Sequence, residues 1–159
     1  MKVGRITLSD RASQGIYRDE SGPEIERVLS ESLGKSIEWT RVLIPDDQGL
    51  IEQKIMELVD VANCCLVITT GGTGPGPRDV TPEATRKVIE KELPGFGEII
   101  RLKTYERVKT SILSRATAGI RGNGLILNLP GNPRAIEECL PLLIPAIQEC
   151  LQHIGSEKR

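Results

Sequence analysis

Short apolar runs that alternate with segments of helical periodicity constrain the fold of this chain more than any other feature. The run Cys64–Thr70 is nearly continuous in apolar residues, as expected for a strand buried on both faces of a parallel sheet. Shorter β-like runs occupy Lys2–Leu8 and Ile37–Ile44, and another buried strand is expected at Leu125–Leu129. Such alternation predicts an α/β fold, a three-layer helix–sheet–helix single domain with a mostly parallel sheet over residues 1–159.

Helical periodicity fills the intervals between these runs. The expected helices are Gly22–Leu33, Leu50–Ala62, Thr81–Glu92, Phe96–Val108 and a C-terminal helix that begins after Asn132-Pro133. Thr81-Pro82 combines a hydroxyl cap with a proline in the first turn, a strong start signal. Pro141 and Pro145 interrupt the last helix, so a kink or two pieces are expected there.

Composition excludes several classes of protein. Apolar residues make up 38% of the 159-residue chain and charged residues 27%, which is a globular composition and not a disordered one. The net charge is −1, which disfavours nucleic acid as a partner. Aromatic residues make up only 3%, so the protein does not hold its ligand by stacking on a row of rings.

Two further patterns suggest a cellular location. No apolar run is long enough to span a membrane or to serve as a signal peptide, so we expect no membrane association. The four cysteines show no CxxC spacing and lie in apolar segments, where buried reduced thiols are the simplest interpretation. A cytoplasmic location is therefore expected.

Polar or glycine-rich turns follow the predicted strands. These turns are Ser9-Asp10-Arg11, Pro45-Asp46-Asp47, the segment from Gly71 to Asp79, and Pro130-Gly131-Asn132-Pro133. Because the carboxyl ends of parallel strands meet at one edge of the sheet, where ligands bind in open α/β folds, these turns are expected to converge. Their convergence is the main sequence evidence for a functional site.

The segment after the third predicted strand is the richest in glycine. It contains Gly71, Gly72, Gly74 and Gly76, which can turn backbone N–H groups toward an anion. No Lys-Ser/Thr pair follows, which excludes a Walker A loop, and the glycine spacing does not fit a dinucleotide fingerprint. A plain tight turn remains the alternative, but the Arg78-Asp79 ending favours a site for phosphate or a polar heterocycle.

Carboxylates stand beside this loop. Helix capping explains one of Asp46 and Asp47 but not both, and Asp79 is not needed to cap the following helix. The acids could hold Mg²⁺ together with substrate phosphates, or could accept N–H groups from a heterocycle edge. Four arginines lie near these turns: Arg11, Arg18, Arg78 and Arg134. They could bind phosphate in a bidentate way, or they could be solvated charges on the surface.

The only histidine, His153, lies near the C-terminus and far from these turns. A histidine general base or a histidine metal site is therefore not expected. The remaining chemistry is of the kind that needs no protein base, such as attack by an already ionised phosphate oxygen. Phosphoryl and nucleotidyl transfer can proceed by positioning, metal ions and fixed dipoles.

Several motifs together resemble the MogA-type molybdopterin adenylyltransferases, which belong to the same molybdenum cofactor biosynthesis family as the plant Cnx and animal gephyrin G domains. The central match is Thr69-Thr70-Gly71-Gly72-Thr73-Gly74 with Arg78-Asp79-Val80-Thr81-Pro82-Glu83-Ala84-Thr85. Supporting matches are Ser9–Ser13, Pro45-Asp46-Asp47, Pro94–Glu98, Leu113-Ser114-Arg115 and Leu129–Pro133. The matches follow the family order along nearly the whole chain.

This resemblance implies a homotrimer that transfers AMP from ATP, with Mg²⁺, to the terminal phosphate of molybdopterin and releases pyrophosphate. The catalytic acids of the family fall on Asp46 and Asp79, which would also hold the Mg²⁺. The expected residues that bind molybdopterin and ATP are Ser9, Asp10, Arg11, Gly71, Gly72, Thr73, Gly74, Arg78, Pro130, Gly131, Asn132 and Pro133.

Two other functions compete with this one. A non-catalytic molybdopterin-binding or scaffold module of the MoaB type would share the glycine loop, but MoaB-type chains typically lack the Arg78–Pro82 run, and a scaffold could dispense with Asp46 and Asp79. A nucleotide phosphatase is disfavoured because no suitable histidine or aspartate motif is present.

Overall fold

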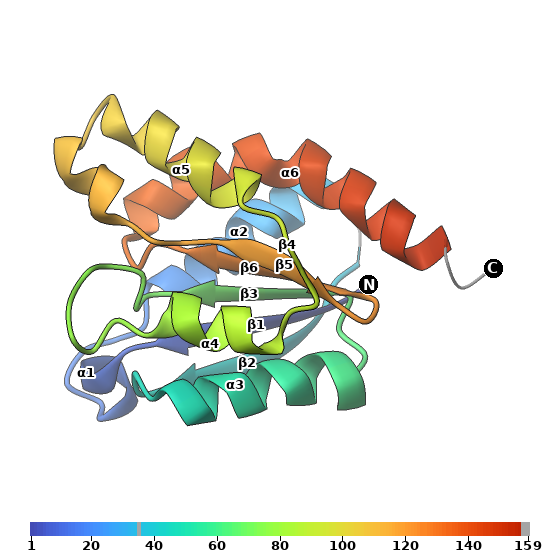
Figure 1. Cartoon of the computed structure of the whole chain (residues 1–159), viewed down its shortest axis with the longest axis horizontal. Helices are drawn as coiled ribbons and strands as arrows, with labels where there is room; N and C mark the ends of the chain where they lie inside the picture. Colours follow the sequence, from blue (N-terminus) through green and yellow to red (C-terminus); the bar gives the residue numbers. More distant parts are fainter. Residues whose placement is uncertain (35, 157–159) are drawn as a thin grey trace.

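A six-stranded sheet runs through the residues that the computed structural model describes, 1–34 and 36–156 (Figure 1). Its strands are β1 (Lys2–Leu8), β2 (Glu38–Ile44), β3 (Leu66–Thr70), β4 (Lys91–Glu92), β5 (Ala118–Arg121) and β6 (Gly124–Leu129). The spatial order is β2-β1-β3-β6-β5-β4, and the first four strands in that order run parallel. β5 and β4 are antiparallel additions at one edge. The predicted α/β class with a mostly parallel sheet is confirmed.

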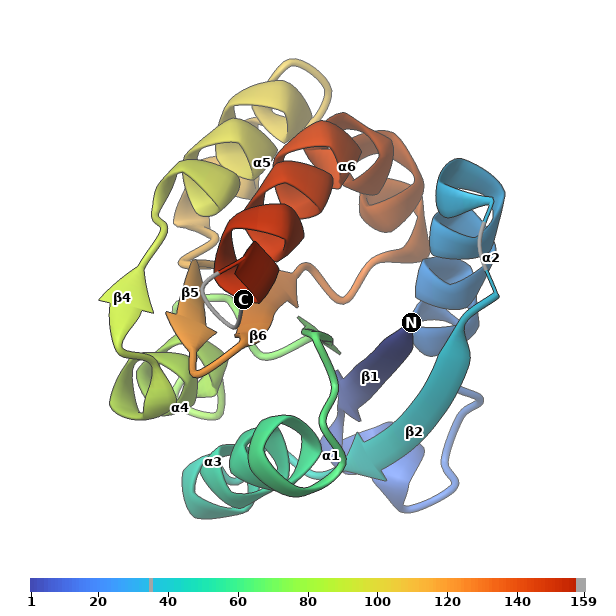
Figure 2. The ribbon, with the colours of Figure 1, turned by 90° about the vertical axis from the view of Figure 1, so that its right-hand side faces the viewer.

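Helices cover both faces of the sheet (Figure 2). They are α1 (Asp10–Ser13), α2 (Ser21–Leu33), α3 (Gln48–Met56) with a π-helical turn η1 (Glu57–Val61), α4 (Thr81–Val88), α5 (Gly95–Tyr105), a 3₁₀ turn η2 (Lys109–Leu113) and α6 (Pro133–Ser156). Helices α2, α5 and α6 pack on one face, and α3 and α4 pack on the other. The arrangement has the three layers that the alternating pattern predicts.

The central strands are apolar at successive positions because both of their faces are covered. On β3, Leu66 and Ile68 join the core beneath α2 and α6, whereas Val67 joins the core above α3 and α4. Leu127 and Ile126 of β6 divide in the same way. All of these side chains are fully buried, which explains why the sequence shows continuous apolar runs rather than alternation.

Strand β1 lies at the point where the winding of the sheet reverses. The chain leaves β1 through α2 to reach β2 on one side, and then crosses back through α3 to β3 on the other side. Crevices at such reversal points, beyond the carboxyl ends of the strands, are the usual ligand sites of open α/β sheets. The topology therefore directs attention to the turns after Leu8 and Thr70.

The predicted helix Thr81–Glu92 is wrong at its C-terminal end. Helix α4 stops at Val88, Ile89 is extended, and Lys91–Glu92 forms β4 against β5. The backbone N–H of Glu90 already donates to the carbonyl of Ile120 at 2.7 Å. Pairing with the exposed edge of β5 thus replaces the last helical turn, and this short antiparallel extension had no clear sequence signal.

Helix α6 is continuous in spite of its two prolines, so the expected division into two pieces is wrong. Pro141 and Pro145 are four residues apart, and both are exposed. Their missing N–H groups leave the carbonyls of Glu137 and Pro141 without helical partners. Glu137 and Pro141 are both exposed, so water can bind their carbonyls and the helix does not need to break.

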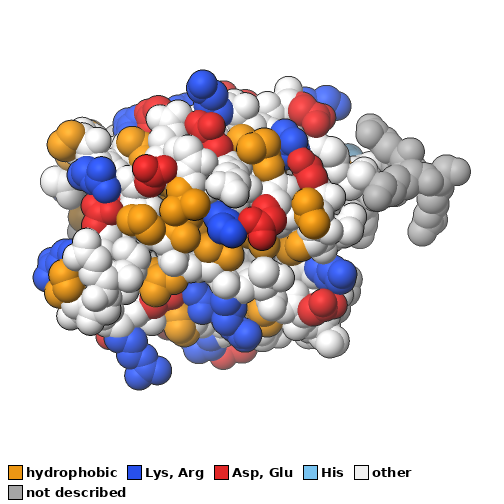
Figure 3. All heavy atoms as spheres, turned by 90° about the horizontal axis from the view of Figure 1, so that it is seen from below, with side chains coloured by type: hydrophobic (Ala, Val, Ile, Leu, Met, Phe, Trp, Pro, Cys, Tyr) orange, Lys and Arg blue, Asp and Glu red, His pale blue; other side chains and the backbone are white. Residues whose placement is uncertain are grey.

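The surface and the thiols bear on two further expectations. Acidic and basic side chains are interspersed with apolar ones on the face seen from below in Figure 3. Within the described residues, no helix combines the length and the hydropathy needed to cross a membrane. All four cysteines are free thiols, Cys64 and Cys139 buried, Cys65 and Cys150 partly buried.

Candidate functional site

A cavity of about 460 Å³ opens at the reversal point, beyond the ends of β1 and β3. Its walls come from segments far apart in sequence: the end of β1, the loop between α1 and α2, Asp46, the glycine-rich turn after β3, and the turn after β6. The lining includes Ser9, Tyr17, Arg18, Asp19, Asp46, Gly71, Gly72, Asp79, Gly131 and Pro133. The predicted convergence of strand-end turns therefore takes place.

The carboxylates of Asp10 and Asp46 each accept a hydrogen bond from the backbone N–H of the other residue. The Asp10 N–H donates to Asp46 Oδ2 at 3.2 Å, and the Asp46 N–H donates to Asp10 Oδ1 at 3.0 Å. Arg78 adds a bidentate ion pair to Asp10, at 3.0 and 2.8 Å. Asp47 caps α3 by accepting from the Leu50 N–H at 2.8 Å. Of the two adjacent acids, only Asp46 therefore faces the cavity.

The two carboxylates differ in their electrostatic environment. Hydrogen bonds from Arg78 hold the pKa of Asp10 below its usual value. Burial raises the pKa of Asp46, and the nearby negative charges of Asp10 and Asp79 add to this rise. The ionised form of Asp46 is thus disfavoured by its surroundings, and carboxyl groups with perturbed pKa values in a cavity are candidates for functional residues.

Asp79 is folded back over the glycine-rich turn. Its Oδ2 accepts from the Gly76 N–H at 2.9 Å, and a Cβ placed on Gly74 or Gly76 would lie 2.8 Å from that oxygen. Neither glycine has a positive φ. The absence of side chains at these two positions is therefore explained by the room that the Asp79 carboxylate needs.

The first two glycines of the turn are required for a different reason. Gly71 and Gly72 have φ values of 98° and 65°. Glycine adopts positive φ values more readily than residues that carry a Cβ. A Cβ on Gly71 would lie 2.4 Å from the carbonyl oxygen of Leu8. The Thr81 hydroxyl does not cap α4 as expected but donates to the carbonyl of Gly71 at 2.9 Å. The turn thus lies against the end of β1.

The turn after β6 is joined to the glycine-rich turn. The Gly71 N–H donates to the carbonyl of Leu129 at 3.2 Å, and the Thr70 hydroxyl donates to the carbonyl of Pro130 at 2.8 Å. A Cβ on Gly131 would lie 3.4 Å from the Cα of Gly71. Gly71, Gly72 and Gly131 line the cavity. Because they have no side chains, they present main chain to it, and we call this part of the lining the main-chain floor.

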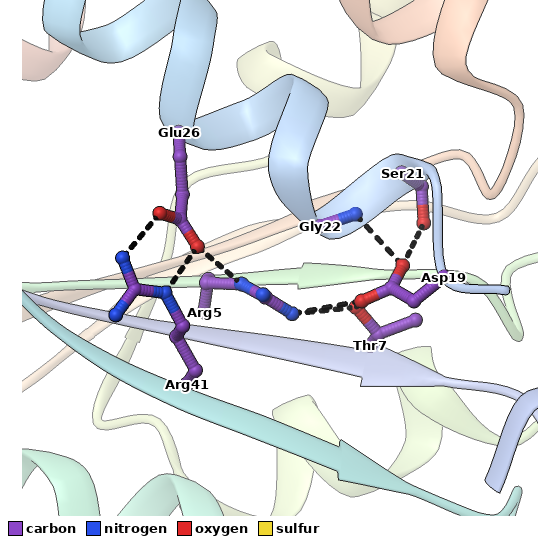
Figure 4. Close-up of polar contacts among 7 residues, drawn as sticks. All are labelled: Arg5, Thr7, Asp19, Ser21, Gly22, Glu26 and Arg41. Atoms are coloured by element: carbon purple, nitrogen blue, oxygen red, sulfur yellow. Dashed lines mark hydrogen bonds and ion pairs between the residues drawn. The ribbon is translucent and has the colours of Figure 1, made fainter.

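A polar network that includes Asp19, in the cavity wall, was not predicted from the sequence (Figure 4). Arg5, 8% exposed, donates to Asp19 at 2.8 Å and to Glu26 at 2.9 Å. Asp19 also accepts from the Thr7 hydroxyl at 2.8 Å and from the Gly22 N–H at 2.9 Å. These bonds fix the loop before α2 onto β1. An acid three residues before Gly22-Pro23 is a capping signal that could have identified Asp19.

Several predicted site residues lie outside the cavity lining. Asp10 lies behind Asp46, and Arg11 lies over the ring of Tyr17 at 5.3 Å from its centroid. Arg134 pairs with Glu138 on α6. The others outside the lining are Thr73, Gly74, Arg78, Pro130 and Asn132. Of the cations considered as phosphate ligands, Arg18 is the one in the lining.

Comparison with known proteins identifies the family of this chain. A family model described as "Probable molybdopterin binding domain" matches residues 4–149. The chain belongs to this family. It is 51% identical over 152 residues to the molybdopterin adenylyltransferase of Helicobacter pylori, covering 96% of this chain and 86% of the relative. Identity to the molybdopterin adenylyltransferase of Escherichia coli is 50% over 140 residues, covering 88% and 72%.

Solved structures of the family share the fold. The molybdopterin biosynthesis enzyme MoaB of Thermus thermophilus superimposes with a TM-score of 0.88 at 36% identity, over 98% of this chain and 96% of that one. Identity is thus higher to the adenylyltransferases than to this MoaB structure. The resemblance seen in the sequence motifs is confirmed at the level of the family.

Proposed function

We propose that this chain is a molybdopterin adenylyltransferase, acting in molybdenum cofactor biosynthesis. The observation that carries the proposal is the placement of Asp46 and Asp79 in one cavity with a glycine-rich turn, in a chain about half identical to adenylyltransferases. Asp46 and Asp79 are the residues to which we assign catalysis. The main-chain floor at Gly71, Gly72 and Gly131 would hold the phosphates.

The proposed reaction joins two phosphates. An oxygen of the terminal phosphate of molybdopterin attacks the α-phosphorus of ATP and forms a new P–O bond. The bond from that phosphorus to the bridging oxygen breaks, and its electrons leave with pyrophosphate. The attacking oxygen is already ionised near neutral pH, so no side chain has to remove a proton. Within the described residues, no histidine lines the cavity.

The donor set fits Mg²⁺. Asp46 and Asp79 offer hard carboxylate oxygens, and a cation between them would offset the repulsion that helps to raise the pKa of Asp46. No group of three or more His, Cys, Asp or Glu side chains in the described part of the chain could form a protein cage for a metal. Mg²⁺ is usually held by one or two carboxylates plus substrate phosphates. When bound, it would neutralise developing phosphate charge.

We also propose the homotrimer and the cytoplasmic location that the resemblance and composition imply. Large apolar side chains are exposed on α5, η2 and α6, and an apolar groove of about 480 Å³ lies between α5 and α6. Examples are Leu102, Ile112, Leu113 and Leu142, exposed by 51–62%. Such a patch marks a contact surface, and sedimentation would determine the number of copies.

The direct test is incubation with molybdopterin, Mg²⁺ and ATP labelled on either the α- or the γ-phosphate. The α-label should appear in adenylyl-molybdopterin and the γ-label in pyrophosphate, both only when molybdopterin is present. Binding of molybdopterin without either product would instead support the scaffold function. Release of inorganic phosphate from ATP alone would support a phosphatase. Either result would refute the transferase proposal.

A further inference from the structure

Arg115 lies outside the cavity lining, yet it contacts the glycine-rich turn near its middle and at its last residue. Its backbone N–H donates to the carbonyl of Thr73 at 2.8 Å. Its Nε donates to the carbonyl of Gly74 at 2.9 Å, and its Nη2 donates to the carbonyl of Asp79 at 2.8 Å. One guanidinium thus connects the first and last residues of the segment Gly74–Asp79.

Apart from the exposed ion pair of Arg78 with Asp10, this segment has little else to fix it in place. Pro75, Pro77 and Arg78 are exposed, and Gly74 and Gly76 carry no side chain that could enter the core. Its internal bonds are from the Gly76 N–H to Asp79 Oδ2 and from the Asp79 N–H to the carbonyl of Gly76. Polar contacts from outside must therefore supply the remaining restraint, and Arg115 supplies them.

The guanidinium is itself held in orientation. Glu83, in the first turn of α4, forms an ion pair with Nη1 of Arg115 and accepts from Nη2 at 3.2 Å. This bond lowers the pKa of Glu83, so the carboxylate stays ionised in the neutral range. Helix α4 and the strand region before β5 are thereby joined to the turn through one planar group.

We propose that Arg115 is a positioning residue for Asp79: it clamps the turn that carries Asp79 and so fixes the place of this residue in the cavity wall. The expected effect of Arg115 on the rate rests on the proposed adenylyl transfer. Its expected effect on the conformation of the turn does not. Lysine could not replace Arg115, because a single ammonium cannot reach two carbonyls and a carboxylate that a planar fork reaches together.

The kinetic test uses R115Q, R115K and D79N with the double variant R115Q/D79N. R115Q should lower kcat by about 10- to 100-fold, because small misplacement of a catalytic group can cost about 10²-fold. The KM for ATP should change less than about threefold, and R115K should not restore the rate. In the D79N background, R115Q should cost less than about threefold, since the group that it positions is already gone. The proposal would be overturned if the kcat losses of R115Q and D79N multiplied in the double variant, or if R115K had the wild-type kcat.

Arg121→Gln is the matched control. Arg121 also pairs with an acid, Asp60, and donates to a carbonyl, that of Val88, but at the opposite end of the sheet. Its variant should retain wild-type kcat; a loss equal to that of R115Q would mean that both arginines act only through stability.

A measurement on the substrate-free protein tests the role of Arg115 independently of the proposed adenylyl transfer. Amide hydrogen exchange across Gly74–Asp79 should be at least about tenfold faster in R115Q than in the wild type, with β3 unchanged. Unchanged exchange in the turn would refute the clamp. If the wild-type chain forms no adenylyl-molybdopterin, the proposed function fails, while the exchange experiment still decides the role of Arg115.

Discussion

Alanine substitutions at Gly72 and Gly74 should separate the backbone requirement of the turn from its catalytic requirement. Alanine at Gly72 must adopt a φ of 65°, which costs roughly 1–2 kcal/mol. Its Cβ would lie 2.4 Å from Thr81 Oγ1, and displacing that hydroxyl from the carbonyl of Gly71 costs about 1 kcal/mol more. The total of about 2–3 kcal/mol should lower the melting temperature by about 4–12 °C for a chain of this size.

Alanine at Gly74 should leave the stability almost unchanged and slow the reaction. Its φ is not in the left-handed region, and its Cβ would meet only the carboxylate of Asp79, at 2.8 Å from Oδ2. We expect a melting temperature within about 2 °C of the wild type and a kcat at least about tenfold lower, because Asp79 is displaced.

Gly34→Ala controls for backbone strain alone, because Gly34 has a φ of 57° and open space around it. It should lose about 1–2 kcal/mol and keep full activity. Calorimetry and steady-state kinetics on the same preparations provide both readouts. A Gly74 variant as unstable as the Gly72 variant, or one with unchanged kcat, would refute this reasoning.

The remaining predictions concern the acids, the pH dependence and the histidine. Asp46→Asn and Asp79→Asn should each lower kcat by at least about 10²-fold, and near-normal turnover of both would contradict the site assignment. Because the folded pKa of Asp46 is raised, its ionisation lowers stability as pH rises through that pKa. Asp46→Asn should therefore raise the melting temperature of the ligand-free protein at neutral pH but not below about pH 4; a gain at both pH values would contradict this. The rate should rise through about pH 6 with the ionisation of the molybdopterin phosphate and stay level toward pH 8, whereas a second rise would indicate a protein base. His153→Gln should keep full activity, since His153 is 74% exposed on α6 beside Glu149, and a loss above about tenfold in a correctly folded variant would be the contrary result.

Those parts of the fold that depend on burial could be predicted from the sequence. Lys2–Leu8 forms a strand at the predicted bounds, and β6 (Gly124–Leu129) differs from its prediction by one residue, because buried strands are marked in the sequence by apolar residues such as Val3, Ile6 and Leu8. The turns after these strands could be placed together because parallel strands end at one edge.

Features that depend on tertiary pairing could not be predicted. Strand β4 exists because the edge of β5 is available, and nothing local in Lys91-Glu92 favours a strand. The buried Arg5 is stable only because Asp19 and Glu26 meet it from the loop before α2 and from α2 itself. Charges of this kind resemble surface residues until their partners are known. Arg115 stood in a family motif, but its contacts with the turn are long-range.

One isotope measurement tests most directly the central claim, adenylyl transfer by attack of an oxygen of the molybdopterin phosphate on the α-phosphorus of ATP. Molybdopterin would be prepared with a heavy oxygen isotope in its terminal phosphate and converted with ATP and Mg²⁺. The account predicts that one labelled oxygen becomes the bridge between the two phosphorus atoms of adenylyl-molybdopterin, and that the released pyrophosphate carries no label. Label in pyrophosphate, or an unlabelled bridge, would contradict it.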